Sequence, residues 1–148
     1  MLFPFAASAQ DTLYMGSGKK AIYTPPSSFT GKSGGNGEYR YWTSGSEFYI
    51  TIGTKWKDGR TAKEILEQGL KGLQTEACED KSHKTEVSTA VWKICRVAVG
   101  PRKEGRLWMV ITFEGVRNAI DIGVHFQEVN EARMEEVRKS IDGIRFVE

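Results

Sequence analysis

The segment from residue 107 to residue 147 constrains the fold more than any other part of the chain. Residues 107–113 are apolar at nearly every position, which is typical of a strand that is buried on both faces. Residues 119–126 then alternate between apolar and small or polar side chains, and this period of two indicates a strand with one buried face. A predicted helix at 130–142 and a short strand at 144–147 follow. We therefore expect adjacent strands with a helix packed on them.

Two helices are predicted. The first begins after Thr61, because Thr61 and Glu64 have the spacing of a capping box and apolar residues continue at helical steps to residue 77. Gly69 and Gly72 each weaken this helix by about 1 kcal/mol relative to alanine. The second helix begins at Asn130, a preferred N-cap residue, and is expected to stop at Gly143.

The other strands are predicted from aromatic and β-branched runs. Residues 38–42 and 47–56 predict a β-hairpin, and residues 85–99 predict a long strand followed by a Gly-Pro turn. Short apolar pieces at 13–15 and 21–23 predict a loosely held first hairpin or strand.

Two segments lack these patterns. Residues 27–37 are rich in glycine and predict a mobile surface loop, and residues 78–84 predict a polar connection. Gly31-Lys32-Ser33 resembles the end of a phosphate-binding loop, but Pro26 stands where that motif needs its first glycine. Nucleotide binding is therefore not expected.

The N-terminus and the cysteines predict export. Residues 1–9 resemble the remnant of a signal peptide with the cleavage pattern Ala7-Ser8-Ala9, although an apolar N-terminus that packs on the core is an alternative. Cys78 and Cys95 suggest one disulfide in such a chain, and two buried thiols are the alternative. We expect a single domain at 10–148, periplasmic or secreted, without a membrane span or lipid anchor.

Charge and aromatic content bear on the choice of partner. The net charge of +2 is too small to imply nucleic acid or an anionic membrane. Aromatic side chains interleaved with cations in the hairpin at 38–56 are typical of a recognition surface, whereas strand alternation would place half of them in the core. The candidate binding residues are Tyr39, Tyr41, Trp42, Tyr49 and Trp56.

A second candidate site is the polar face of the strand at 119–126. Asp121 and His125 share this face, but they lie roughly 13 Å apart along a strand and cannot contact each other. They are either part of a ligand face completed from elsewhere or satisfied polar residues on a half-exposed sheet. The polar run at 78–83 makes a poor metal site once Cys78 is in a disulfide, so no metal or other cofactor is expected.

The order of elements resembles the PsbP-like fold of small lumenal and envelope proteins. The resemblance covers Tyr39 to Glu148 and includes the strand of Trp92, its Gly-Pro turn, and the closing helix that runs into Ser140-Ile141-Asp142-Gly143-Ile144-Arg145-Phe146. It implies an α+β protein in which a mostly antiparallel sheet is covered by two helices, as an α/β/α sandwich. No active-site motif defines this fold, so no functional residue is carried over.

The expected function is that of an exported, non-enzymatic interaction protein that binds another protein, as an accessory subunit or an immunity-type inhibitor. The alternative is a periplasmic protein that binds a small ligand or metal through the face around Asp121 and His125, with hydrolytic activity as a further option.

Overall fold

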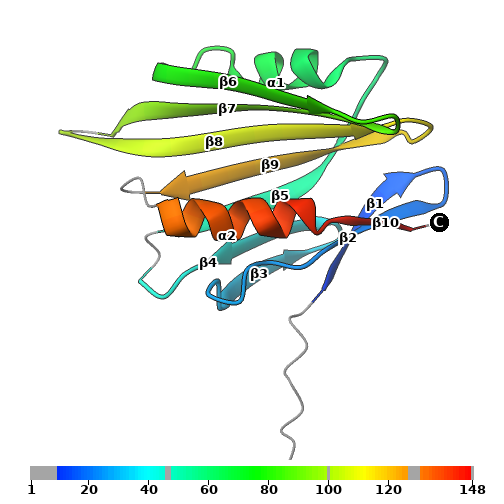
Figure 1. Ribbon diagram of the computed structural model, residues 1–148, viewed down its shortest axis with the longest axis horizontal. Coiled ribbons are helices and arrows are strands. Elements are labelled where there is room, and N and C mark those ends of the chain that lie inside the picture. The colour runs from blue at the N-terminus through cyan, green and yellow to red at the C-terminus, as the bar shows by residue number, and fades with distance from the viewer. Residues whose placement is uncertain (1–9, 46–47, 100, 127–130, 148) are drawn as a thin grey trace, which may run out of the picture.

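The computed structural model describes residues 10–45, 48–99, 101–126 and 131–147, and these contain ten strands and two helices (Figure 1). Seven strands form a large antiparallel sheet in the order β3-β4-β5-β9-β8-β7-β6. They are β3 (Gly31–Gly35), β4 (Glu38–Trp42), β5 (Phe48–Trp56), β6 (Glu76–Lys84), β7 (Ser88–Val99), β8 (Arg102–Phe113) and β9 (Asn118–Phe126). A small antiparallel sheet consists of β1 (Asp11–Gly16), β2 (Lys19–Tyr23) and β10 (Arg145–Val147).

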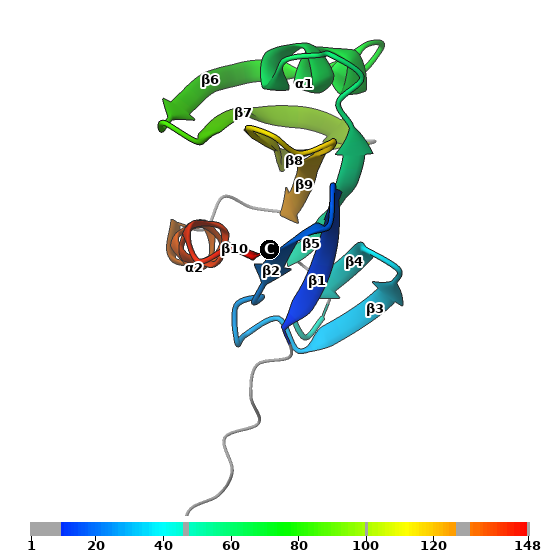
Figure 2. The ribbon, with the colours of Figure 1, turned by 90° about the vertical axis from the view of Figure 1, so that its right-hand side faces the viewer.

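The prediction of an α/β/α sandwich is wrong, because the fold is dominated by its two sheets (Figure 2). The helices α1 (Ala62–Leu70) and α2 (Glu131–Asp142) are short and each covers only part of one sheet face. The physical reason is the N-terminal hairpin β1–β2, which the sequence predicted only as a loosely held element. Leu13, Met15 and Tyr23 have no exposed surface, and the hairpin covers β5 and β9 where a second helical layer would otherwise lie.

The main core lies on the face of the large sheet that we call the inner face, marked by Ile50 of β5, Met109 of β8 and Ile122 of β9. This face packs against the small sheet and against Val137 of α2. Burial alternates along β9 as the period of two predicted, so that prediction of a one-sided strand is confirmed.

The opposite face, which we call the outer face, carries α1. Ile65 and Leu66 of α1 pack with Val110 of β8 in a second, smaller core. The predicted capping box is confirmed, since Thr61 and Glu64 bond reciprocally at the start of the helix.

The prediction that α1 continues to residue 77 is wrong. The helix ends at Leu70, Gly72 adopts a φ of +87°, and Leu73 is 52% exposed. Of the two glycines that weaken the helical pattern, Gly69 lies in the last turn of α1 and Gly72 lies just after its end.

Two predicted loops are strands. Residues 31–35 form β3, and residues 78–84 belong to β6, which is exposed along its whole length. β6 had no sequence signature because neither of its faces is buried, and its charged side chains are typical of an edge strand that avoids pairing with other chains. In β3, a Cβ at Gly31 would lie 2.0 Å from the Trp42 indole nitrogen, so glycine lets the indole lie against the backbone.

The predicted disulfide is confirmed: Cys78 and Cys95 join β6 to β7. Within the described ranges, no helix has the length and hydropathy that crossing a membrane requires. The predicted signal-peptide remnant at residues 1–9 and the predicted N-cap Asn130 lie outside the described residues.

Candidate functional site

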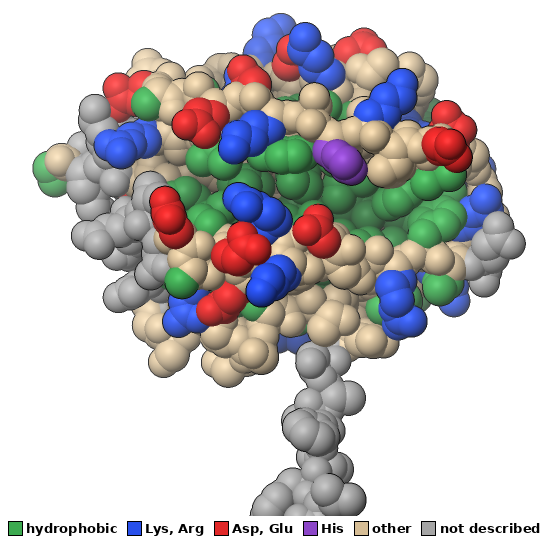
Figure 3. Space-filling model, viewed as in Figure 1, with side chains coloured by type: hydrophobic (Ala, Val, Ile, Leu, Met, Phe, Trp, Pro, Cys, Tyr) green, Lys and Arg blue, Asp and Glu red, His purple; other side chains and the backbone are tan. Residues whose placement is uncertain are grey.

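An apolar groove runs between α2 and the inner face of β7 and β8. Its volume is about 590 Å³, which is within the range of ligand-binding pockets. Figure 3 shows the groove open along its length, with a continuous hydrophobic floor and charged side chains on both sides. The lining consists mainly of apolar residues, namely Ala90, Trp92, Ile94, Leu107, Met109, Ile111, Phe113, Met134, Val137, Ile141 and Ile144.

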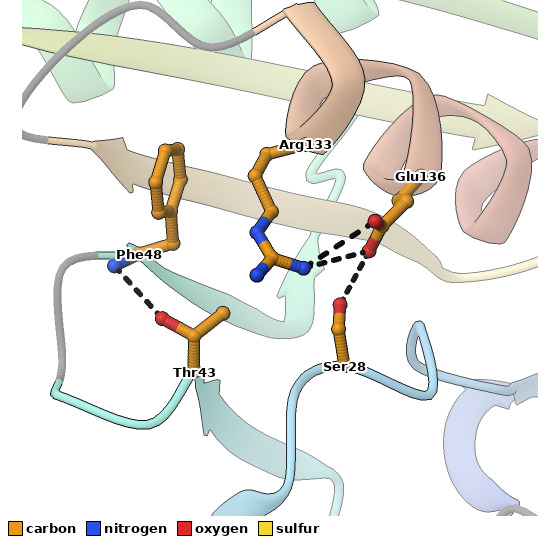
Figure 4. Close-up of polar contacts among 5 residues, drawn as sticks. All are labelled: Ser28, Thr43, Phe48, Arg133 and Glu136. Atoms are coloured by element: carbon orange, nitrogen blue, oxygen red, sulfur yellow. Dashed lines mark hydrogen bonds and ion pairs between the residues drawn. The ribbon is translucent and has the colours of Figure 1, made fainter.

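Among the described residues, the hydrogen bonds that join α2 to other elements lie on the side of the helix next to the small sheet. The Tyr23 hydroxyl of β2 lies 2.9 Å from the Ser140 hydroxyl of α2. Glu136 accepts a hydrogen bond from the Ser28 hydroxyl and a second from Arg133, whose Nη1 is 3.3 Å away (Figure 4). The contacts with Tyr23 and Ser28 hold α2 next to the small sheet, and the inner face of β7 remains partly uncovered on its other side.

Several apolar side chains of the groove are only partly buried, whereas Leu107, Met109, Ile111 and Val137 at its floor are buried. Trp92 and Ile94 of β7 and Met134 and Ile141 of α2 all retain exposed surface. A contiguous exposed apolar surface of this kind, rimmed by polar residues, is typical of an interaction site.

The groove continues past the N-terminal end of α2 into a second cavity of about 1030 Å³, with which it shares Ile94, Met134 and Arg138. Half of the residues that line this second cavity are charged, namely Glu76, Glu79, Lys81, Arg96, Glu131, Glu135 and Arg138. Together the two cavities form an apolar centre with a charged end.

A second group of chemically notable residues lies on the outer face. Tyr49, His125 and Arg106 stand opposite one another on β5, β9 and β8. The Tyr49 hydroxyl is 2.8 Å from Nδ1 of His125, and a carboxylate oxygen of Glu104 is 2.6 Å from Nε2. Glu104 is only 4% exposed, and Nη2 of Arg106 lies 3.6 Å from the same carboxylate oxygen.

Burial is the main cause that lowers the pKa of His125, and the positive charge of Arg106 acts in the same direction, against the opposing effect of Glu104. The imidazole is therefore neutral near pH 7. In that form its Nε2–H donates to Glu104 and its Nδ1 accepts from the Tyr49 hydroxyl. Both ring nitrogens of His125 therefore have a partner within the network, and these partners hold the imidazole in one tautomer.

The rings of this network are stacked. The Tyr49 and His125 rings lie 4.4 Å apart with an interplanar angle of 15°, and the Arg40 guanidinium carbon is 4.6 Å from the Tyr49 ring centroid. We call Arg40, Tyr49, His125, Glu104 and Arg106 the stacked row. It crosses β4, β5, β9 and β8.

The structure divides the aromatic residues predicted as a binding surface between two faces. Tyr41 is 1% exposed and donates to the Asp11 carboxylate, while Tyr39 is half-buried and stacks on Tyr41. Trp42 covers Gly31 and Tyr49 belongs to the stacked row, both on the outer face. Trp56 is 61% exposed at the end of β5. These five residues therefore do not form one continuous surface.

Of the two residues predicted on the polar ligand face, His125 lies in the stacked row and Asp121 pairs with Lys55 at 3.4 Å. Sequence reasoning missed Glu104 and Arg106, because it assigned residues 100–105 to a turn. Glu104, Arg106 and Trp108 are spaced two residues apart and so share one face of a strand. This spacing was the signal that β8 begins before Leu107. The groove left no sequence signal, because it depends on where α2 lies.

No model of a known protein family matches the chain, and no curated protein matches it in sequence.

Proposed function

We propose that the chain is an exported, non-enzymatic binding protein that holds an apolar segment of another protein in the groove beside α2. The observation that supports this proposal most strongly is the row of partly exposed apolar side chains between β7 and α2. The disulfide supports export, because such bonds persist in oxidising compartments.

The shape of the groove favours a protein segment over a small molecule. Pockets for small molecules bury most of the ligand surface, whereas this groove is open along its length (Figure 3). An apolar centre with a charged rim is also the common anatomy of a protein interface. α2 has 12 residues and is therefore about 18 Å long, which suits about three turns of a partner helix.

The lining also suits partner recognition. Met109 and Met134 are flexible and polarisable, so they can adapt to different apolar side chains. The hydrogen bonds of Ser140 and Glu136 fix α2 in place, so little ordering of the helix is needed when a partner binds.

The proposal can be tested with random 16-residue peptides displayed on phage and selected on the folded protein. We expect the selected peptides to carry apolar residues at helical spacing. The test variant is Ile141→Lys, which places a charge at a half-buried position in the groove. Losing the burial of one isoleucine costs about 1.5–3 kcal/mol, so peptide affinity should fall at least about tenfold.

The matched control is Leu73→Lys, which makes the same kind of change at an exposed leucine outside the groove. This variant should bind the peptides with unchanged affinity. Selected peptides that bind Ile141→Lys as tightly as the unaltered protein would place the binding surface elsewhere. Selection of no peptides, together with binding of fatty acids that Ile141→Lys abolishes, would make the groove a lipid site instead.

A further inference from the structure

A polar hollow of about 390 Å³ lies on the outer face of the large sheet, away from the groove beside α2. It is formed across β3, β4, β5 and β9, and its chemically active lining consists of Ser33, Glu38, Arg40, Thr51, Lys55 and Asp121. Gly53 lets the Glu38 side chain lie close to β5, because a Cβ at this position would lie 3.1 Å from Cγ of Glu38.

Arg40 is the cation of the hollow that stacks on an aromatic ring. The sheet register places it between Ser33 of β3 and Thr51 of β5, so two hydroxyl groups flank it. Its guanidinium stacks on Tyr49, which stacks in turn on His125, and a carboxylate oxygen of Glu104 lies 2.6 Å from Nε2 of that imidazole. A guanidinium stacked on an aromatic ring keeps its hydrogen-bonding edge available for a carboxylate.

Only two of the four charged side chains that line the hollow pair with each other among the described residues. Lys55 and Asp121 pair with each other at 3.4 Å. Arg40 and Glu38 form no ion pair with any described residue, so the hollow retains one cation and one anion of its own. They are two residues apart on β4 and share the outer face, about 7 Å from each other along the strand.

We propose that this hollow binds a small zwitterion of the free amino-acid type. Its carboxylate binds the Arg40 guanidinium and the Ser33 hydroxyl, and its ammonium group binds Glu38. The partly buried network of the stacked row then has a role, because it fixes the orientation of Arg40. The site is independent of the groove proposed for a protein partner.

The test is a titration of the ¹⁵N-labelled protein with each of the twenty common amino acids, followed by amide chemical shifts. Acetate, methylammonium and inorganic phosphate serve as probes that carry only one sign of charge. We expect at least one amino acid to shift the amides around Arg40 and Gly53 at lower concentration than any single-charge probe does.

Arg40→Gln and Glu38→Gln should each weaken amino-acid binding at least about tenfold without changing the thermal midpoint, because both side chains are exposed. Glu86→Gln, an exposed acid outside the hollow, is the matched control and should change neither. Acetate or phosphate that binds as tightly as the best amino acid, with Glu38→Gln neutral or strengthening, would overturn the zwitterion in favour of a simple anion site. No amide shift around Arg40 with any probe would overturn the site altogether.

Discussion

The disulfide between Cys78 and Cys95 is expected to hold the edge strand β6 on the large sheet. β6 is exposed on both faces, and its pairing with β7 is interrupted by a bulge between Glu76 and Glu79. The bond closes a loop with a sequence separation of 17 residues. The chain-entropy relation gives such a loop about 3 kcal/mol of stabilisation.

Removal of the bond in Cys78→Ser/Cys95→Ala, or by reductant, should therefore lower the free energy of unfolding by about 3 kcal/mol. For a chain of this size that corresponds to a fall of about 6–12 °C in the thermal midpoint. Denaturant titration of the oxidised and reduced protein measures the first quantity. Amide hydrogen exchange measures where the structure loosens, and we expect the amides of β6 to lose protection before those of β5 and β9.

Two results would refute this reasoning. A loss of stability well below 1 kcal/mol would show that the bond does not constrain the unfolded chain as the loop length requires. Unchanged protection in β6 after reduction would show that pairing with β7 suffices to hold the strand. Because Lys81 and His83 of β6 line the cavities beside α2, loosening of β6 should also weaken binding in the groove.

Further substitutions test the packing. Gly105→Ala should lower the free energy of unfolding by about 2 kcal/mol or more, because the new Cβ would lie 1.8 Å from the buried Phe126 ring. Gly35→Ala is the control: its Cβ would enter open space, so the free energy of unfolding in the same denaturant titration should change by no more than about 0.5 kcal/mol. Tyr23→Phe removes the hydrogen bond to Ser140 and should cost about 1 kcal/mol. Burial raises the pKa of Tyr23 to about 12, above its ordinary value near 10. The unfolded chain therefore loses this proton first, and the free energy of unfolding should fall between pH 10 and pH 12 by up to about 1.4 kcal/mol per pH unit from this group. Tyr23→Phe should show a shallower fall, and equal slopes in both proteins would contradict the assignment.

The sequence predicted best those elements that follow one local rule. Alternation in β9, the capping box at Thr61 and the pairing of the two cysteines each depend on a short pattern that the fold preserves. β6 and β3 escaped prediction because an exposed edge strand has no apolar face and a glycine-rich strand has no side chains to pack.

The candidate sites escaped prediction for a different reason. His125 was recognised as a candidate, but its partner Glu104 lies on a neighbouring strand and became visible only through the sheet register. The groove depends on the contacts of Ser140 and Glu136 with residues more than 100 positions earlier in the chain. Tertiary contacts of this kind decide which apolar faces are covered, and hydrophobic periodicity alone does not report them.

Methyl chemical-shift mapping of the protein with its tightest selected peptide is the most direct test of whether the groove beside α2 is the binding site. If the peptide occupies the groove, the largest shifts will be at the methyl groups of Ile94, Met109, Met134 and Ile141. Shifts that instead concentrate at Ile65 and Leu66 under α1, with the groove methyls unchanged, would contradict the proposed site.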